Sequence, residues 1–305
     1  MHFVMDYKSL LPSRSIRFFI LRCLKFLPDR IMLALQYYIK MGKRCNFSNP
    51  DRWTEKLQLY KMHYRNPLLG MCTDKYKVRQ YVERKGLGEN LVELYGVYDN
   101  ADEIDFGKLP VRFVLKTTDG GGGNNVVLVN NKLSLDVVSL RKQLNSWINV
   151  KDVNAGREWA YTQIDKSMII AEELLVNNAA PDAGIEDFKI LCFYGEPKYI
   201  IVDKDRYIDH KRNFYDVDWN RVDVTTDHDQ FEEPFQKPEN LEEMLSVAKI
   251  LAEDFPFVRV DLYNVDGKIY FGELTFYPWS GYVKFSPEDF DRELGALLDE
   301  KTFKI

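Results

Sequence analysis

Apolar residues recur at helical or strand spacing along most of the chain, and these patterns predict its elements. Helical spacing predicts helices over 49–64, 73–86, 133–149 and 240–255, and a shorter one over 287–300. Runs of β-branched and aromatic residues predict strands over 91–98, 111–116, 126–129, 168–171, 188–194, 198–203, 257–262 and 268–275. Helices alternate with strands, and short turns join several of the strands. This arrangement favours the α+β class with mostly antiparallel sheets.

Two of the predicted helices carry end signals. Asn240, with Glu243 three positions later, has the spacing of a capping box. Thr73 or Asp74 is expected to cap the helix over 73–86, and Gly86 to end it. These residues therefore predict where the two helices begin and end.

The segment over 111–125 combines an apolar strand with a glycine loop. The strand ends on Lys116, and four consecutive glycines follow: Gly120, Gly121, Gly122 and Gly123. Because glycine lets main-chain N–H groups approach a ligand closely, a glycine loop beside a lysine suits the phosphates of a nucleotide. The next strand, over 126–129, would make this loop a flap. The alternative is a flexible turn without a ligand, because the loop has neither P-loop nor dinucleotide-binding spacing.

The last two predicted strands bring three charged residues together. The connection over 264–267 predicts a three-residue loop with a bulge, which places Arg259 opposite Glu273 and Asp261 opposite Phe271. Strand alternation then puts Arg259, Asp261 and Glu273 on one face. Two neighbouring carboxylates suit a Mg²⁺ ion that also holds substrate phosphates. A solvated polar face with an Arg–Glu pair is the alternative.

Composition places the chain among globular proteins large enough for two or more subdomains. Its 305 residues are 45% hydrophobic and 29% charged. The net charge of −5 argues against a general nucleic-acid binder. Four scattered cysteines without C-x-x-C spacing predict buried free thiols of a reducing compartment, rather than disulfides or a zinc site.

The first 45 residues differ in charge from the remainder. They contain nine Lys and Arg against two Asp, a net charge of +7, which leaves −12 for the rest of the chain. Arg22 and Lys25 interrupt the apolar run over 16–27, so neither a signal peptide nor a spanning helix is predicted. The cations fall on one side of a helix, a pattern found in helices that lie on a membrane surface, and such contact is one interpretation. Packing against the main body, with 31–41 as the partner, is the alternative.

Taken in order, the motifs resemble those of ATP-grasp enzymes. More narrowly, the chain resembles the TupA-like ATP-grasp family of surface-polysaccharide biosynthesis, over roughly 42–295. The motifs are DKYKVR at 74–79, FVLK at 113–116, IAEE at 170–173, DHKRNFYD at 209–216, FVRVDLY at 257–263 and GELTF at 272–276, followed by Pro278 and Gly281. Several motifs in order are far more specific than any one of them.

The resemblance implies nucleotide contacts at matched positions. Lys75 and Lys116 are similar to the two lysines that hold ATP phosphates, and the glycine loop is similar to the flap over them. The segment that reads adenine, mainly through main-chain groups, matches Glu172, Glu173 and Leu175. Asp187 and Lys189, which alternate on one strand face, are candidates for ribose, phosphate or acceptor contact.

The resemblance also implies a magnesium site and an acceptor site. Asp261 and Glu273 resemble the Mg²⁺ carboxylates, and Thr275 stands where many ATP-grasp enzymes have asparagine, with a hydroxyl that could ligate the ion. A cationic loop suited to an anionic sugar acid or to an acyl phosphate comprises Lys204, Arg206, His210, Lys211 and Arg212. A solvated basic surface is the alternative for this loop.

The implied fold is the ATP-grasp fold, in which two α+β subdomains hold ATP between antiparallel sheets. We expect a basic helical extension over 1–48, an α/β part over 49–110, a small subdomain with the flap over 111–175 and a large subdomain over 176–305. The implied activity is that of a carboxylate–amine ligase. A carboxylate takes the γ-phosphoryl group of Mg·ATP, and an amine then attacks the acyl phosphate to give an amide, ADP and phosphate. Two lysines, Arg259 and Mg²⁺ would neutralise the charge that is transferred.

For a TupA-like protein, the implied acceptor is a uronic acid of a capsular or cell-wall polysaccharide, amidated by an amino acid or amine. Such a protein is expected in the cytoplasm, where residues 1–45 would hold it near lipid-linked glycan at the inner face of the bacterial membrane. Two alternatives stay open. One is a kinase that phosphorylates a hydroxyl, and the other is a non-catalytic or glycosyltransferase role in the same pathway.

Overall fold

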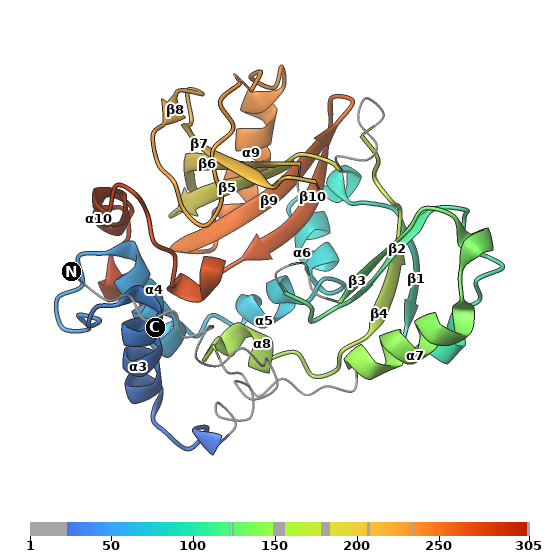
Figure 1. The fold of residues 1–305 in the computed structure, drawn as a ribbon, viewed down its shortest axis with the longest axis horizontal. Helices are drawn as coiled ribbons and strands as arrows, with labels where there is room; N and C mark the ends of the chain where they lie inside the picture. The colour runs from blue at the N-terminus through green and yellow to red at the C-terminus, as the bar shows by residue number, and fades with distance from the viewer. Residues whose placement is uncertain are drawn as a thin grey trace.

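Two antiparallel sheets form the framework of the protein (Figure 1). The computed structural model describes residues 23–121, 123, 125–148, 156–177, 184–205, 208–233 and 235–303. Within these ranges, a four-stranded sheet has the order β1-β4-β2-β3 and a six-stranded sheet has the order β10-β9-β5-β6-β7-β8. Every ladder recorded within them is antiparallel. The α+β class expected from the sequence is confirmed.

The four-stranded sheet carries the glycine loop. It consists of β1 (Leu94–Tyr98), β2 (Phe113–Thr117), β3 (Val126–Val129) and β4 (Ile169–Glu172). Phe113 and Leu115 are buried in a cluster with Leu140 and Leu144 of α7 (Val137–Ile148), whereas Lys116 alternates onto the other face. β2 and β3 pair directly as the two strands beside the glycine loop, as predicted.

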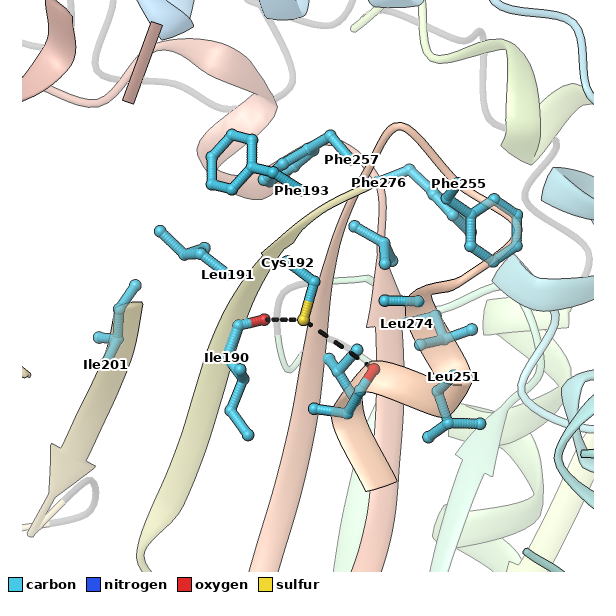
Figure 2. Packing of buried hydrophobic residues seen from close by; sticks show 14 of the residues in the cluster. Ile190, Leu191, Cys192, Phe193, Ile201, Leu251, Phe255, Phe257, Leu274 and Phe276 are labelled. Carbon is cyan, nitrogen blue, oxygen red and sulfur yellow. Dashed lines mark hydrogen bonds between the residues drawn. The ribbon is translucent and has the colours of Figure 1, made fainter. Parts of the chain in front are cut away.

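The six-stranded sheet separates an apolar face from a charged face. It comprises β5 (Asp187–Phe193), β6 (Glu196–Lys204), β7 (Lys211–Asp216), β8 (Arg221–Val222), β9 (Phe257–Val265) and β10 (Lys268–Thr275). Helix α9 (Leu241–Ala252) packs on the apolar face, where Cys192 Sγ lies 4.0 Å from the Ala248 carbonyl oxygen (Figure 2). Strand alternation therefore leaves Lys189 and Asp261, which are paired across β5 and β9, on the opposite face.

The remaining helices lie at one end of the large sheet and between the two sheets. Helices α3 (Asp29–Met41), α4 (Trp53–His63) and α10 (Asp289–Ala296) cover one end of the large sheet, where Trp53 packs edge-on against Phe257 at 5.3 Å. Figure 1 shows α5 (Leu68–Thr73) and α6 (Val78–Arg84) between the sheets, with α8 (Trp159–Thr162) beside α5. Short 3₁₀ turns lie at η1 (Gly88–Asn90), η2 (Ala101–Glu103), η3 (Lys132–Ser134), η4 (Pro278–Gly281) and η5 (Glu300–Phe303).

Two helix predictions need correction. The helix expected over 73–86 is regular only from Val78, because α5 ends at Thr73 and a turn follows it. The Asp74 carboxylate caps this turn, as expected, by accepting hydrogen bonds from the main-chain N–H groups of Tyr76 and Lys77 at 2.9 and 2.8 Å. Gly86, with φ of 77°, follows α6 closely, as expected. Asn240 precedes α9, but its side chain does not cap that helix and donates instead to the Gly267 carbonyl oxygen.

The β9–β10 turn is shorter than predicted, and the predicted pairs were wrong. Asp266 and Gly267, with φ of 52° and 79°, form a two-residue turn that pairs Val265 with Lys268. Such a turn alone would put Glu273 on the α9 face. A bulge at Gly272 shifts the register by one residue, so Glu273 lies opposite Asp261, and Thr275 lies opposite Arg259. Arg259, Asp261 and Glu273 consequently share one face after all.

All four cysteines lie in the described part of the chain and are free thiols. Cys72 and Cys192 are buried and Cys45 is half-buried, but Cys23 is exposed, so the prediction of burial was wrong for Cys23. None of the helices in the described ranges combines the length and apolar character needed to cross a bilayer. Most of the predicted N-terminal helix, residues 16–22, lies outside those ranges.

Candidate active site

Lys75 connects the glycine loop to the large sheet. The break between α5 and α6 brings its main-chain N–H to the Thr118 carbonyl oxygen at 2.9 Å, at the base of the loop. Its ammonium group donates to the Gly120 carbonyl oxygen and lies 3.6 Å from Glu273 Oε2. The loop, the α5–α6 turn and strand β10 therefore meet at one lysine.

A second lysine lies beside a buried carboxylate. Lys116 Nζ on β2 is 2.5 Å from Glu172 Oε2 on β4, and Arg79 Nη1 is 3.5 Å from Glu172 Oε1. Lys75, Lys116, Arg79 and Glu172 line one narrow cavity with Gly272 of β10. Both predicted lysines therefore face the same space between the two sheets.

The segment after β4 is only partly available to a ligand. The main-chain N–H of Glu173 already donates to the Glu93 carbonyl oxygen at 2.9 Å. A ligand that reads this segment through the main chain is therefore left with the carbonyl oxygen of Glu173 and the groups around Leu175, which is half-buried. Asp187 opens β5 and contacts Lys189.

Arg259 lies at the centre of the predicted magnesium residues. Its Nε and Nη2 donate to the two oxygens of Asp261 at 2.6 and 2.5 Å. The same Nη2 is 3.3 Å from Glu273 Oε1 and 3.1 Å from Thr275 Oγ1. One buried guanidinium thus neutralises two carboxylates that would otherwise repel each other across the ladder.

Further charges continue along the same sheet face. Lys189 Nζ lies 4.0 Å from Asp261 Oδ2 and 3.2 Å from Asp203 Oδ2 on β6. Asp203 in turn accepts two hydrogen bonds from Arg212 of β7, at 2.6 and 3.0 Å. Contacts of alternating sign therefore cross the sheet, and we call these residues the charged row: Lys75, Glu273, Arg259, Asp261, Lys189, Asp203 and Arg212.

Neighbouring charges set the protonation of this row. Partial burial alone would raise the pKa of Glu273. The Lys75 ammonium and then the Arg259 guanidinium together have the larger, opposite effect and lower this pKa to about 2. Burial likewise opposes ionisation of Asp203, yet Arg212 and Lys189 hold the pKa of that carboxyl well below its usual range. Burial raises the pKa of Asp261, while Arg259 favours its ionised form. Glu273 is the ionised acid of the row with the most solvent access, because 34% of its side chain is exposed.

The residues predicted to ligate magnesium all offer oxygen atoms, which Mg²⁺ prefers. Both oxygens of Asp261 are bound to Arg259, whereas Glu273 is open to solvent and accepts a hydrogen bond from Thr275 Oγ1 at 3.0 Å. In the described ranges, no group of three or more His, Cys, Asp and Glu residues is placed to hold a metal. Mg²⁺ usually keeps several waters and binds through one or two carboxylates and substrate phosphates. Asp261, Glu273 and Thr275 fit an ion of that kind.

The predicted cationic loop is largely not a loop. Lys204 ends β6, whereas Lys211 and Arg212 begin β7. Arg212 is only 6% exposed because its guanidinium is bound by Asp203 and by Asp227, and Lys211 pairs with Asp209 at 3.2 Å. Arg206 lies outside the described residues, as does Gly122 of the glycine loop.

Three residues at the site were missed by sequence reasoning. Arg79 lies within the motif at 74–79, but its contact with Glu172 depends on the fold. Asp203 follows an apolar run near the end of β6, and this position could have marked it as a candidate. Its partners, however, come from two neighbouring strands. Tyr161 of α8 lies against the glycine loop, since a Cβ added at Gly121 would be 3.1 Å from its hydroxyl oxygen.

The two sheets, with the glycine loop and the charged row between them, define an ATP-grasp protein. Residues 55–299 match the family described as TupA-like ATPgrasp. The chain belongs to this TupA-like ATP-grasp family, as the motifs indicated.

Solved ATP-grasp structures are similar in fold. A D-alanine–D-alanine ligase from Bacillus anthracis is 19% identical, with 74% of this chain and 65% of that chain covered and a TM-score of 0.45. An L-amino acid ligase from Bacillus licheniformis is 16% identical, with 79% of this chain and 50% of that chain covered and a TM-score of 0.46. The ADP complex of purK, an N5-carboxyaminoimidazole ribonucleotide synthetase, is 19% identical, with 68% of this chain and 45% of that chain covered and a TM-score of 0.42. This chain thus spans 45–65% of the length of these three proteins. A search of the curated proteins finds no match.

Proposed function

We propose that the chain is an ATP-dependent carboxylate–amine ligase. A carboxylate takes the γ-phosphoryl group of ATP to become an acyl phosphate, and an amine then displaces phosphate to leave an amide. The observation that supports this most is the charged row, which runs from Lys75 beside the glycine loop to Arg212 on β7. A row of this kind places the Lys75 ammonium beside the triphosphate and continues across the sheet towards the acceptor.

The nucleotide occupies the end of the row nearest the four-stranded sheet. Lys75 and Lys116 bind its phosphates beneath the flap of Gly120, Gly121, Gly122 and Gly123, and residues 111–175 act as the small subdomain. Because Lys116 is paired with Glu172 in the structure, nucleotide binding exchanges this ion pair for a lysine–phosphate contact. Adenine lies against the segment formed by Glu172, Glu173 and Leu175, with Asp187 near the ribose.

Phosphoryl transfer takes place over β9 and β10. Transfer of this kind needs mainly positioning and charge neutralisation, and Arg259 supplies a guanidinium between Asp261 and Glu273. Asp261, Glu273 and Thr275 would hold Mg²⁺, which neutralises negative charge on the phosphates when it is bound. Lys189 orients the acceptor carboxylate next to this centre.

The acceptor lies towards β7, near Lys189, His210, Lys211 and Arg212. We assign it as an anionic sugar acid, such as a uronic acid of a capsular or cell-wall polysaccharide, with an amino acid or amine as the second substrate. Membership of the TupA-like family supports this assignment. Lys211 is half-exposed at the start of β7, where it pairs with Asp209.

The N-terminal part contributes peripheral contact with an anionic membrane. Helix α3 buries one face against the body and exposes an apolar stripe on the other, with Ile31, Leu35, Tyr38 and Ile39 exposed by 53%, 40%, 57% and 40%. The net charge of +7 over residues 1–45 complements anionic lipid headgroups. A cytoplasmic enzyme held in this way would reach lipid-linked glycan at the inner face of the membrane.

Trapping with hydroxylamine tests the ligase function. The enzyme is incubated with ATP, Mg²⁺, hydroxylamine and a panel of uronic acids, and ADP and hydroxamate are measured. A ligase yields both products with its carboxylate substrate. ADP with a phosphorylated acceptor and no hydroxamate would identify a kinase. If no acceptor gives ADP, a non-catalytic or glycosyltransferase role in the pathway replaces this proposal.

A further inference from the structure

Two histidines stack at the β7 end of the charged row. The ring centroids of His210 and His228 are 3.7 Å apart, with an angle of 34° between the rings. His210 directly precedes β7, and His228 comes from the chain between β8 and α9. Both are partly buried, so neither ring is a freely moving surface group.

A buried carboxylate lies beside the first histidine. His210 Nε2 is 3.4 Å from Asp203 Oδ2, and Asp203 is itself held by Arg212 and Lys189. A carboxylate at this position favours the tautomer with its proton on Nε2, which leaves the basic lone pair on Nδ1. The same relationship between carboxylate and imidazole orients the histidine base of other enzymes.

The surroundings favour a neutral imidazole. The charged or titratable groups that face His210 are Asp203 of β6, Arg212 of β7 and His228, while the adjacent Asp209 and Lys211 pair with each other. Burial, followed by His228 and Arg212, lowers the pKa of His210 below its ordinary value, although Asp203 opposes this shift. At neutral pH, His210 is therefore in the form that accepts a proton.

We infer that His210, oriented by Asp203 and stacked on His228, is the general base that deprotonates the amine substrate. The inference rests on the proposed ligase function. An amine is bound as an ammonium ion and must lose a proton before its nitrogen can attack. His210 is separated from Asp261 along the charged row only by Asp203 and Lys189, so it lies at the acceptor side of the transfer centre.

The proton balance of the step is complete. The ammonium loses two protons as it becomes an amide. His210 takes one proton at Nδ1, and the neutral nitrogen attacks the carbonyl carbon of the acyl phosphate. The C–N bond forms, the bond from carbon to the phosphate oxygen breaks, and phosphate leaves with the electron pair. The second proton leaves with the phosphate, and His210 returns its proton to water.

Hydroxylamine separates this role from acyl phosphate formation. It is a much weaker base than an alkyl amine and is largely unprotonated at neutral pH, so its attack needs no general base. In His210→Gln, we expect amide formation to fall by on the order of 10²-fold, while ATP-dependent hydroxamate formation is retained. His63→Gln, which removes an exposed histidine at the end of α4, should retain both activities.

The pH profile provides a second readout. Amide formation by the wild type should decline towards acid pH as His210 becomes protonated and should level off above the pKa of His210. In His210→Gln, where solvent must take the proton, amide formation should keep rising with pH without levelling off. His228→Gln removes a neighbour that lowers the pKa of His210, so the decline should move to higher pH. Equal loss of amide and hydroxamate in His210→Gln, or loss of neither, would overturn the role of His210 as general base but would leave the ligase function standing. Absence of hydroxamate from the wild type would overturn the ligase function as well.

Discussion

Asp261 and Glu273 lie directly opposite each other in the β9–β10 ladder, although the two-residue turn between these strands would place them on opposite faces. The bulge at Gly272 restores the shared face by adding one residue to β10. A single backbone irregularity thus decides whether the two carboxylates can act on one ligand. The geometry of the site depends on a residue that has no functional side chain.

Replacing Gly272 with alanine should therefore disturb the fold locally. The new Cβ would lie 3.0 Å from the Asp261 carbonyl oxygen and 3.2 Å from the Tyr263 ring. We expect Gly272→Ala to lower the free energy of unfolding by about 1–3 kcal/mol, as overpacked sites do. Urea unfolding measures this loss. Gly88→Ala is the matched control, because its Cβ would meet only the Glu83 side chain at an ordinary 3.7 Å. Equal stability of the two variants would show that the bulge tolerates a side chain.

Lys116→Ala should weaken nucleotide binding. The substitution removes a cation assigned to the phosphates, and hydrogen bonds to charged groups contribute about 1.5–3 kcal/mol. We expect the dissociation constant for a non-hydrolysable ATP analogue to rise by roughly 10- to 100-fold, as measured by calorimetry. Lys142→Ala, at an exposed position on α7, should bind like the wild type. An unchanged affinity in Lys116→Ala would contradict the assigned phosphate contact.

Lys61 should make stability rise with pH. Its ammonium is buried and donates to the carbonyl and hydroxyl oxygens of Ser280, at 2.6 and 2.9 Å. Burial lowers the pKa of Lys61 to about 7. Between this value and the pKa of an unfolded lysine, about 10.4, the unfolded chain binds more protons. The free energy of unfolding therefore rises with pH in this window.

Lys61→Met should flatten that rise. The contribution of one such group approaches about 1.4 kcal/mol per pH unit at its steepest, so the wild type should show the steeper slope between about pH 7 and 9. Chemical unfolding at a series of pH values measures the slope. Lys268→Met removes an exposed lysine and should keep the wild-type slope. Identical slopes for wild type and Lys61→Met would show that Lys61 is not the group responsible.

The apolar stripe of α3 should bind anionic vesicles. We expect the protein to sediment with vesicles that contain phosphatidylglycerol, but not with phosphatidylcholine alone. Replacing Leu35 and Ile39 together with serine should reduce binding by at least about tenfold, because each buried aliphatic side chain contributes about 1.5–3 kcal/mol. Leu133→Ser is the control, since Leu133 is an exposed leucine in η3, away from α3. Vesicle binding that is absent, or equal in all variants, would refute the membrane contact.

The sequence predicted the elements more reliably than the contacts between them. Runs of β-branched and aromatic residues located β2, β3, β9 and β10. The β9–β10 register was wrong because a bulge lies in strand rather than turn residues. An isolated glycine within a strand, such as Gly272, is the available signal for a bulge.

The charged row shows why the rest of the site was not predictable. Asp203 contacts Lys189 from β5 and Arg212 from β7, so its role depends on the order of three strands. Arg212 was predicted to lie in an exposed loop, since a run of basic residues gives no indication of a buried partner. Lys75 contacts Glu273 from the turn between α5 and α6, where a continuous helix was expected.

Transfer of ¹⁸O from the acceptor carboxylate tests the central claim most directly. The carboxylate substrate is labelled with ¹⁸O, and the phosphate released during amide formation is analysed by mass spectrometry. The proposed mechanism predicts one ¹⁸O atom in each phosphate, and neither ADP nor labelled phosphate from a folded Glu273→Gln variant. Unlabelled phosphate, or a phosphorylated acceptor without phosphate release, would contradict activation of the carboxylate as an acyl phosphate.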